Sequence, residues 1–262
     1  FVERTYAIFT SQDLLHWELL QKFDLPGDDE CPDLYPLTAD DGRTLWVYSG
    51  AHDMYFVGDF DENGLYQPIQ SVGQLSYNSQ SYAAQTYYYE PGKPVIRFAW
   101  NRSDIPGAPF NGSMCTPTEM TLKKHGDRYY LSALPIKSTE NLVVKSDKLD
   151  DFTLAHCTHE LGSKTCRISF TVKEGDITCS LYGLEMKLDK NGLTCGESIL
   201  PRLKNEPMKV DIITDTNSVE IYLNGVANTV IAHVLDETKP TFTIHAEDPV
   251  EVQNLTVSEL SL

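Results

Sequence analysis

The 262-residue chain lacks an excess of basic residues: 21 Lys and Arg stand against 38 Asp and Glu, and the formal net charge is −17. Nucleic acids and anionic membrane surfaces require basic patches on a protein, so this charge argues against both as partners. The chain also lacks an apolar run of about 18 residues, the length that a membrane-spanning helix needs. The negative net charge is compatible with a neutral substrate such as a sugar.

The beginning of the chain lacks an initiator Met and a signal-peptide layout. Residues 1–9 alternate in character and are rich in aromatic side chains, which is typical of the middle of a strand. We therefore expect the sequence to be a fragment or a processed piece of a longer protein. Its compartment, cytoplasmic or secreted, stays open.

Paired metal-binding cysteines are absent as well, because none of the six cysteines belongs to a Cys-x-x-Cys pair. His156, Cys157 and His159 form a loose cluster of metal-ligand types. On a strand, however, His156 and His159 point to opposite faces, and a closed zinc site needs four ligands. The sequence predicts no metal and no cofactor. The disulfide state and the oligomeric state stay open.

A sustained helical period is missing before Leu142, and short strands take its place. We expect residues 11–17 to form a turn with one short helical turn, and residues 123–127 to form another turn. The first half predicts strands at Tyr6–Thr10, Thr44–Tyr48, Met54–Asp59, Ser81–Tyr89, Val95–Trp100, Met114–Leu122 and Arg128–Leu134. Repeated antiparallel units of this kind suit a propeller or a sandwich.

A polar connection at residues 135–142 marks a boundary. Beyond it we expect a β-sandwich of about 120 residues, a normal domain size. Three aromatic residues there, Tyr182, Tyr222 and Phe242, are expected to face the core. The clearest strands are predicted at Cys166–Val172, Ile177–Leu181, Met208–Thr214, Ser218–Leu223 and Thr241–His245, with a partly alternating segment at 250–262.

The segment Glu30-Cys31-Pro32-Asp33 follows the acidic turn at residues 25–29 and precedes a predicted hairpin. A glutamate beside a cysteine and a rigid proline, at the mouth of a strand, suits acid–base chemistry. Chemistry alone leaves a second interpretation open, in which Glu30 is a solvated turn residue.

Several segments match one enzyme family in the right order. The tetrapeptide beginning at Glu30 matches its E-C-P-D motif letter for letter. Six other segments resemble family motifs more loosely. In the first half, Ser11–Glu18 resembles S-x-D-L-x-x-W, Tyr55–Asp61 resembles Y-x-x-G-x-F/Y-D, and Tyr82–Tyr87 resembles Y-A-x-Q-S/T-F. Further on, Phe98–Trp100 resembles the end of R-x-x-F-G-W, with Val95 in place of the arginine, Gly112–Met120 resembles G-x-M-T-L-P-R-E-L, and Asp215–Leu223 resembles D-x-S-S-V-E-V-F-V. The chain resembles the later part of glycoside hydrolase family 32, the invertase, levanase and fructanase family.

The resemblance implies an all-β fold, a five-bladed β-propeller followed by a β-sandwich. Residues 1–137 would hold the later blades, and residues 143–262 would form the sandwich. The family's nucleophilic aspartate lies in a W-M-N-D-P-N-G segment, and a stabilising aspartate lies in an R-D-P motif. Neither motif occurs among the 262 residues. The resemblance therefore places the nucleophile outside this chain.

Roles for four residues follow from the resemblance, together with the chemistry of their side chains. Glu30 would be the acid/base, with Cys31 beside it. Asp33 would orient a sugar hydroxyl or the loop, or it is simply a turn cap. Trp100 is a candidate sugar platform, or a core residue. Tyr77 could present its hydroxyl to a sugar, or it is an ordinary loop tyrosine.

The chain departs from the family at Ser76 and Gln80, which replace the aspartates of a D-x-G-x-D-F-Y-A segment, and at Thr118, which replaces the arginine of P-R-E. Loss of an aspartate weakens charge-assisted binding of a sugar hydroxyl, so the sugar specificity stays open. Two hypotheses follow. The first is a glycosidase that hydrolyses β-fructofuranosidic bonds in sucrose or fructans. The second is an inactive carbohydrate-binding or structural fragment.

Overall fold

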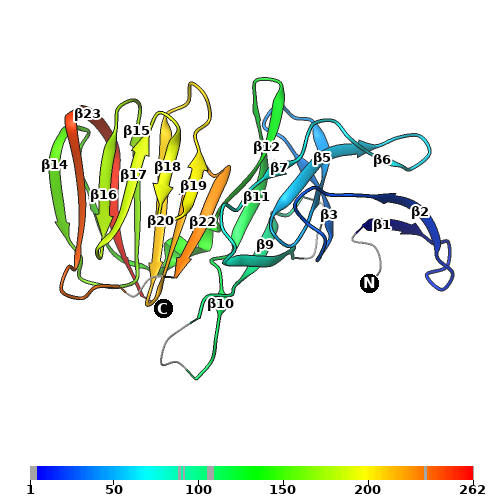
Figure 1. The fold of residues 1–262 in the computed structure, drawn as a ribbon, viewed down its shortest axis with the longest axis horizontal. Coiled ribbons are helices and arrows are strands. Elements are labelled where there is room, and N and C mark those ends of the chain that lie inside the picture. Colours follow the sequence, from blue (N-terminus) through cyan, green and yellow to red (C-terminus); the bar gives the residue numbers. More distant parts are fainter. Residues whose placement is uncertain (1–4, 88–89, 91, 105–108, 233–234, 262) are drawn as a thin grey trace.

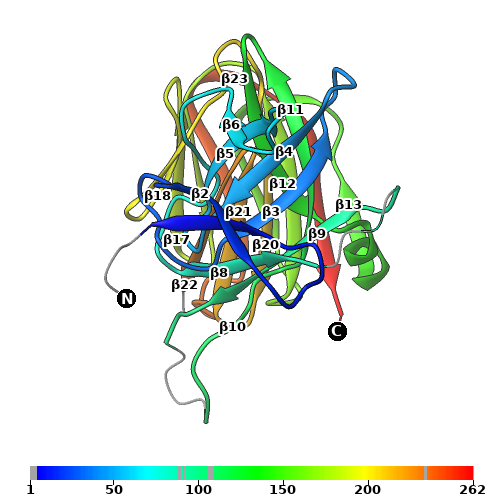
Figure 2. The same ribbon diagram turned by 90° about the vertical axis from the view of Figure 1, so that its right-hand side faces the viewer.

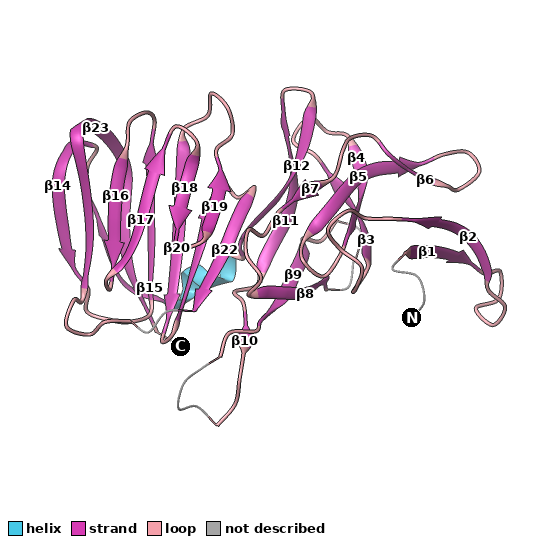
Figure 3. Ribbon diagram, viewed as in Figure 1, coloured by secondary structure: helices cyan, strands magenta, loops and turns pink. Residues whose placement is uncertain are grey.

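The computed structural model describes residues 5–87, 90, 92–104, 109–232 and 235–261. Within these ranges the chain is built of strands and one short 3-10 helix, η1 (Lys137–Leu142) (Figure 3). The predicted all-β class is confirmed. None of the described helical residues forms a helix long and apolar enough to cross a membrane.

The first two strands, β1 (Tyr6–Thr10) and β2 (Glu18–Phe23), form a separate hairpin at one end of the molecule (Figures 1 and 2), where Tyr6 and Phe23 pack with Tyr48. The predicted helical turn at residues 11–17 is wrong, because this segment is a series of bends. The carboxylate of Asp13 accepts the backbone N–H groups of Leu15 and His16, at 2.9 and 2.8 Å. A side chain that binds nearby backbone donors in this way competes with helical hydrogen bonds.

Sheet I follows and is antiparallel, in the order β3-β4-β5-β6, with the short strand β7 beside β5. Both of its faces are apolar: Val47 belongs to one core cluster and Tyr48, its neighbour in sequence, to another. Such alternation is typical of a strand buried on both faces. The strands are β3 (Asp33–Thr38), β4 (Thr44–Ser49), β5 (Met54–Phe60), β6 (Tyr66–Pro68) and β7 (Gly73–Gln74).

Sheet II packs against sheet I through a shared core that includes Tyr35, Val47, Val95 and Leu131. Its strands are β8 (Ser81–Thr86), β9 (Val95–Asn101), β10 (Ser113–Met114), β11 (Thr118–His125) and β12 (Arg128–Pro135).

Three predictions in sheet II need correction. The single strand expected at residues 114–122 is divided into β10 and β11, and Pro117, which has no N–H to donate, lies in the break. The turn expected at residues 123–127 starts later, because β11 continues to His125. The strand expected to reach Tyr89 ends at Thr86, and residues 88–89 lie outside the described part.

From Val143 on, every described strand belongs to one large sheet of eleven strands that folds over on its own core (Figure 1). Tyr182 and Phe242 belong to this core, as predicted, whereas Tyr222 is buried but lies outside that core cluster. The strands are β13 (Val143–Lys148), β14 (Phe152–Glu160), β15 (Cys166–Val172), β16 (Ile177–Leu181), β17 (Leu184–Asp189), β18 (Gly192–Cys195), β19 (Ser198–Pro201), β20 (Met208–Asp215), β21 (Ser218–Leu223), β22 (Ala227–Ala232) and β23 (Thr241–Leu260).

The long strand β23 joins the two parts of this sheet. The sequence predicts separate segments at 241–245 and 250–262, whereas the structure has one strand of 20 residues. Its first part pairs with β14 and β16, and its second part pairs with β13 and β15. The turn-like residues between, including Pro249, form a bulge opposite Leu154 and His156, where the register shifts. A bulge accommodates a proline without ending the strand.

The two halves of the chain are joined by hydrogen bonds between backbone groups. The N–H of Tyr77 donates to the carbonyl of Asn228 at 2.8 Å, and the N–H of Asn228 donates to the carbonyl of Leu75 at 2.9 Å. The N–H of Ala133 donates to the carbonyl of Gly225 at 2.8 Å. Sheet II and the loop before it are thereby attached to the edge of the large sheet at β21 and β22.

Candidate functional site

Glu30 lies in the loop between β2 and β3 with an exposed side chain, while its backbone is held from two sides. Its carbonyl accepts hydrogen bonds from the hydroxyl of Tyr6 at 2.8 Å and from the N–H of Ala51 at 2.9 Å. The next residue, Cys31, has a φ of 48°, a conformation that L-residues rarely adopt. The loop therefore presents the Glu30 carboxylate in a defined direction.

The carboxylate of Glu30 accepts a hydrogen bond from the hydroxyl of Tyr82 on β8. This bond, followed by burial and by the charge of Glu30, raises the pKa of Tyr82 to about 12. A donor with a raised pKa keeps its proton throughout the neutral range. The contact joins the loop that precedes sheet I to the first strand of sheet II.

Further side chains surround the ring of Tyr82. The guanidinium of Arg102 lies 4.1 Å from the ring centroid, the distance of a cation–π contact. The rings of His52 and Trp100 meet it edge-on, with centroids 4.8 and 6.4 Å away. Trp100 is 45% exposed, so it is not the core residue that one interpretation expected. An accessible aromatic surface thus lies in the cluster that contains Glu30 and Tyr82.

Both carboxylate oxygens of Asp33 bind backbone N–H groups. One accepts from Thr86 at 2.5 Å, and the other accepts from Leu34 at 2.9 Å. Beside it, the side-chain amide of Gln85 donates to the carbonyl of Cys31 at 2.9 Å. The bonds from Thr86 and Gln85 attach the Glu30 loop to β8.

Tyr77 lies elsewhere. Its ring packs against the core of the large sheet, and its backbone is bonded to Asn228, as described above. Burial raises the pKa of Tyr77 to about 12. The structure therefore brings Glu30, Asp33 and Trp100 together around β8, and it does not add Tyr77 to that group.

Sequence reasoning missed the buried ion pair behind the site. Asp53 and Arg97 are 3% and 4% exposed. The Nε of Arg97 donates to one oxygen of Asp53 at 2.9 Å, and its Nη2 donates to the other oxygen and to Ser81. Burial acts to lower the pKa of Arg97, but the charge of Asp53, its hydrogen bonds and the nearby Cys115 and Tyr222 together outweigh burial, so the pKa is raised and Arg97 stays charged. An acidic residue in a tight turn carries no mark of burial in the sequence, so the sequence held no signal for this pair.

The Asp53–Arg97 pair supports the backbone that holds Glu30. The N–H of Asp53 donates to the carbonyl of Gly50 at 3.1 Å, which closes the turn between β4 and β5. Ala51, the donor to Glu30, belongs to this turn. The pair thus fixes the turn from inside the protein, while Ala51 contacts the site.

All six cysteines are free, which answers the question that the sequence left open. Burial, followed by the charges of Glu30 and Asp28, raises the pKa of Cys31. Among the described residues, no group of three or more His, Cys, Asp or Glu side chains is arranged to hold a metal ion.

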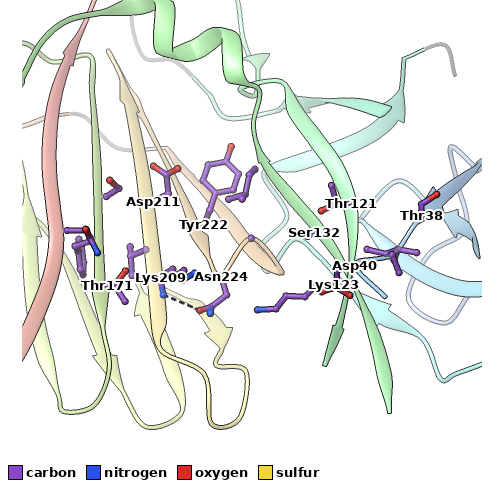
Figure 4. A pocket seen from close by; sticks show the side chains of 18 residues that line it. Thr38, Asp40, Thr121, Lys123, Ser132, Thr171, Lys209, Asp211, Tyr222 and Asn224 are labelled. Carbon is purple, nitrogen blue, oxygen red and sulfur yellow. Dashed lines mark hydrogen bonds between the residues drawn. The ribbon is translucent and has the colours of Figure 1, made fainter. Parts of the chain in front are cut away.

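A separate groove of about 640 Å³ lies between sheet II and the large sheet (Figure 4). Thr121, Lys123 and Ser132 line one wall, and Lys209 and Asp211 line the other (Figure 4). None of Glu30, Tyr82 or Trp100 lines this groove, so it is distinct from the cluster around Glu30.

Comparison with known proteins decides the family. Residues 2–133, about half of the chain, match the profile of the glycosyl hydrolases family 32 N-terminal domain. The chain belongs to glycosyl hydrolase family 32. The matched region contains Glu30, Tyr82, Trp100, sheet I and nearly all of sheet II, so the cluster around Glu30 lies within the part of the chain that shows the family.

Two curated relatives of this family 32 chain are bacterial. It is 28% identical over 162 residues to the fructan beta-fructosidase of Streptococcus mutans, and 26% identical over 186 residues to the levanbiose-producing levanase of Bacillus subtilis. These matches cover 52% and 62% of the chain, but 11% and 35% of the two relatives. The chain thus spans well under two thirds of the length of either relative.

Solved structures of the family confirm the propeller-type all-β fold. The exo-inulinase of Aspergillus awamori matches with a TM-score of 0.77 and 18% identity, over 98% of this chain and 62% of that one. The fructofuranosidase of Schwanniomyces occidentalis, in complex with fructose, matches with a TM-score of 0.76 and 19% identity, over 99% and 66%.

Proposed function

We propose that this chain is part of a glycoside hydrolase that cleaves β-fructofuranosidic bonds, as in sucrose or fructans, and that Glu30 is its acid/base. The observation that carries the proposal is the family 32 match, which spans residues 2–133 and so includes the Glu30 motif. Relatives named as fructan, levan and inulin hydrolases support fructosides as the substrate class.

The proposed reaction is a retaining double displacement. Glu30 donates its proton to the glycosidic oxygen while a nucleophilic carboxylate attacks the anomeric carbon, so the leaving group departs as an alcohol. Glu30 then takes a proton from water, and this water cleaves the fructosyl ester. In a retaining pair the two carboxyl groups lie about 5–5.5 Å apart. The proposal assigns the nucleophile to residues outside these 262, because the motifs that carry it in the family are not among them.

The proposed architecture assigns residues 1–137 to the later blades of a five-bladed propeller and residues 143–262 to a β-sandwich. The sheet membership of the strands supports this division, since η1 lies between β12 and β13. Within the site, Trp100 would be the sugar platform, and Asp33 would hold the loop of Glu30. A contact of Tyr77 with a sugar stays a prediction, and the packing described above favours a role between the two parts.

The test is Glu30→Gln in the full-length protein that contains this sequence. The amide keeps the shape of the side chain but cannot donate a proton as an acid, so we expect kcat for sucrose or a fructan to fall by about 10²–10⁴ with the fold intact. The 262-residue chain alone should release no fructose from sucrose. Wild-type turnover by the Gln variant would show that Glu30 is not the acid/base.

A further inference from the structure

Asp28 is a buried carboxylate two residues before Glu30. Its side chain is 0% exposed. One oxygen accepts the backbone N–H of His52 at 2.7 Å. The other accepts the N–H of Asp29 at 3.2 Å and lies 3.2 Å from Nδ1 of His52. A buried carboxylate is costly without partners, and Asp28 directs two of its contacts at one residue, His52.

The neighbouring glycine makes room for this carboxylate. A Cβ added at Gly50 would lie 2.5 Å from Cγ of Asp28 and 2.6 Å from the hydroxyl of Tyr6. Real Cβ atoms essentially never approach other atoms so closely. Gly50 therefore lets Asp28 and Tyr6 reach the turn between β4 and β5, and Tyr6 in turn binds the carbonyl of Glu30.

The contact with Asp28 fixes how His52 presents its ring. Nδ1 of His52 lies 3.2 Å from an oxygen of Asp28, within hydrogen-bond distance, and the backbone N–H of His52 donates to the other oxygen, so the imidazole is held from two points. The side chain of His52 is 38% exposed, and its ring packs edge-on against Tyr82 at an interplanar angle of 64°. Tyr82 then donates its hydroxyl to the carboxylate of Glu30.

The main-chain carbonyl and the side-chain carboxylate of Glu30 thus both depend on the dipeptide Ala51-His52. The N–H of Ala51 holds the main-chain carbonyl of Glu30, and the ring of His52 supports the tyrosine that holds its carboxylate. Asp28 holds this dipeptide through the backbone and the imidazole of His52. A continuous series of contacts therefore runs from Asp28 through His52 and Tyr82 to the carboxylate of Glu30.

We propose that Asp28 and His52 are positioning residues, which hold the acid/base Glu30 in the direction of the glycosidic oxygen. The proposal rests on the proposed function of Glu30. Neither residue needs to touch the substrate, because each acts through Tyr82 or through the backbone of Ala51. Their effect should therefore appear in the step that needs the proton of Glu30, and little elsewhere.

The experiment compares leaving groups in the full-length protein. Sucrose has a poor leaving group that needs protonation, whereas p-nitrophenyl β-D-fructofuranoside has a good one that hardly needs it. The variant His52→Asn keeps a donor for Asp28 and removes the ring beside Tyr82, and Asp28→Asn removes the carboxylate. We expect kcat/KM for sucrose to fall about tenfold in each, which is part of the effect of a general acid. The value for the nitrophenyl substrate should stay within about twofold of the wild type.

Two further variants are measured alongside. His16→Ala breaks a second Asp–His pair, in which Nδ1 of His16 lies 2.6 Å from an oxygen of Asp13 on the exposed hairpin, and it should leave both substrates unaffected. Glu30→Gln should show the same selective loss as His52→Asn, only larger. Selective loss in the His52 and Asp28 variants supports the proposal.

The opposing results are distinct. Equal losses on both substrates would show a general structural role for His52 and Asp28, and unchanged sucrose activity would show no role; either result overturns the positioning proposal alone. If Glu30→Gln itself spares sucrose, Glu30 is not the acid, and both proposals fall together.

Discussion

The phenol of Tyr82 donates to the carboxylate of Glu30 across the junction between sheet II and the loop that precedes sheet I. The two residues are 52 positions apart in the sequence. The bond therefore exists only where the two sheets pack side by side, and it gives the first prediction a direct spectroscopic signal.

Replacing Glu30 with Gln should lower the pKa of Tyr82 from about 12 toward the ordinary value near 10, because its hydroxyl would no longer face a carboxylate. The measurement is the difference in tyrosinate absorbance between Glu30→Gln and Glu30→Gln/Tyr82→Phe, followed as pH rises. The same difference between the wild type and Tyr82→Phe gives the starting value. Identical titrations in the two pairs would contradict the contact.

The raised pKa of Tyr82 also makes the stability of the folded protein depend on pH. The pKa of Tyr82 is higher in the folded than in the unfolded state, so its contribution is fully present below pH 10 and is lost as pH rises toward about 12. Tyr82→Phe should therefore show a shallower loss of stability over that range than the wild type.

Asp53→Asn should destabilise the protein by about 3–5 kcal/mol, because it leaves the buried guanidinium of Arg97 without its charge partner. Asp211→Asn is the matched comparison. Asp211 also binds an arginine, Arg167, through two nitrogens, but the side chains of that pair are 13% and 24% exposed. Water can replace part of the lost contact there, so the loss should be smaller. Denaturant unfolding of both variants measures the difference, and equal losses would argue against burial as the cause.

Native alkylation should modify Cys31 and Cys157 before the other cysteines. These two are half-buried, whereas the other four are buried. Burial raises the pKa of Cys166 to about 11 and the pKa values of Cys115 and Cys195 to about 12, so little thiolate forms at neutral pH. Mass spectrometry after iodoacetamide treatment, with and without denaturant, gives the order. Early modification of the buried group would contradict the packing.

Trp100→Ala in the full-length protein should raise KM for sucrose by about two- to tenfold, since an aromatic contact is worth about 0.5–1.5 kcal/mol. Its half-exposed ring should make the change in melting temperature small. Trp17→Ala is the control, because Trp17 is 55% exposed on the hairpin and lies outside the Glu30 cluster. An unchanged KM in Trp100→Ala would leave Trp100 without a role in binding sugar.

The strands predicted from alternation agree best with the structure where both ends carry a turn signal. Cys166–Val172, Ile177–Leu181 and Ser218–Leu223 have the predicted bounds. The prediction failed where a proline misled it: Pro117 interrupts an apparently continuous strand, and Pro249 lies inside a continuous one. A proline removes a donor in either case, and the partner strand decides whether pairing ends or a bulge absorbs the loss.

By itself, the sequence determined the all-β class, the family and Glu30 as the candidate acid, because periodicity and motif spacing are local properties of the chain. Tertiary structure alone decided what surrounds Glu30. At Ala83, with a φ of 52°, the pairing of β8 with β9 is irregular just after Tyr82. The burial of Asp28 and Asp53, and the contact between Tyr82 and Glu30, depend on packing between distant segments. Burial and cross-sheet distance are properties of the folded chain, and no local pattern of residues encodes them.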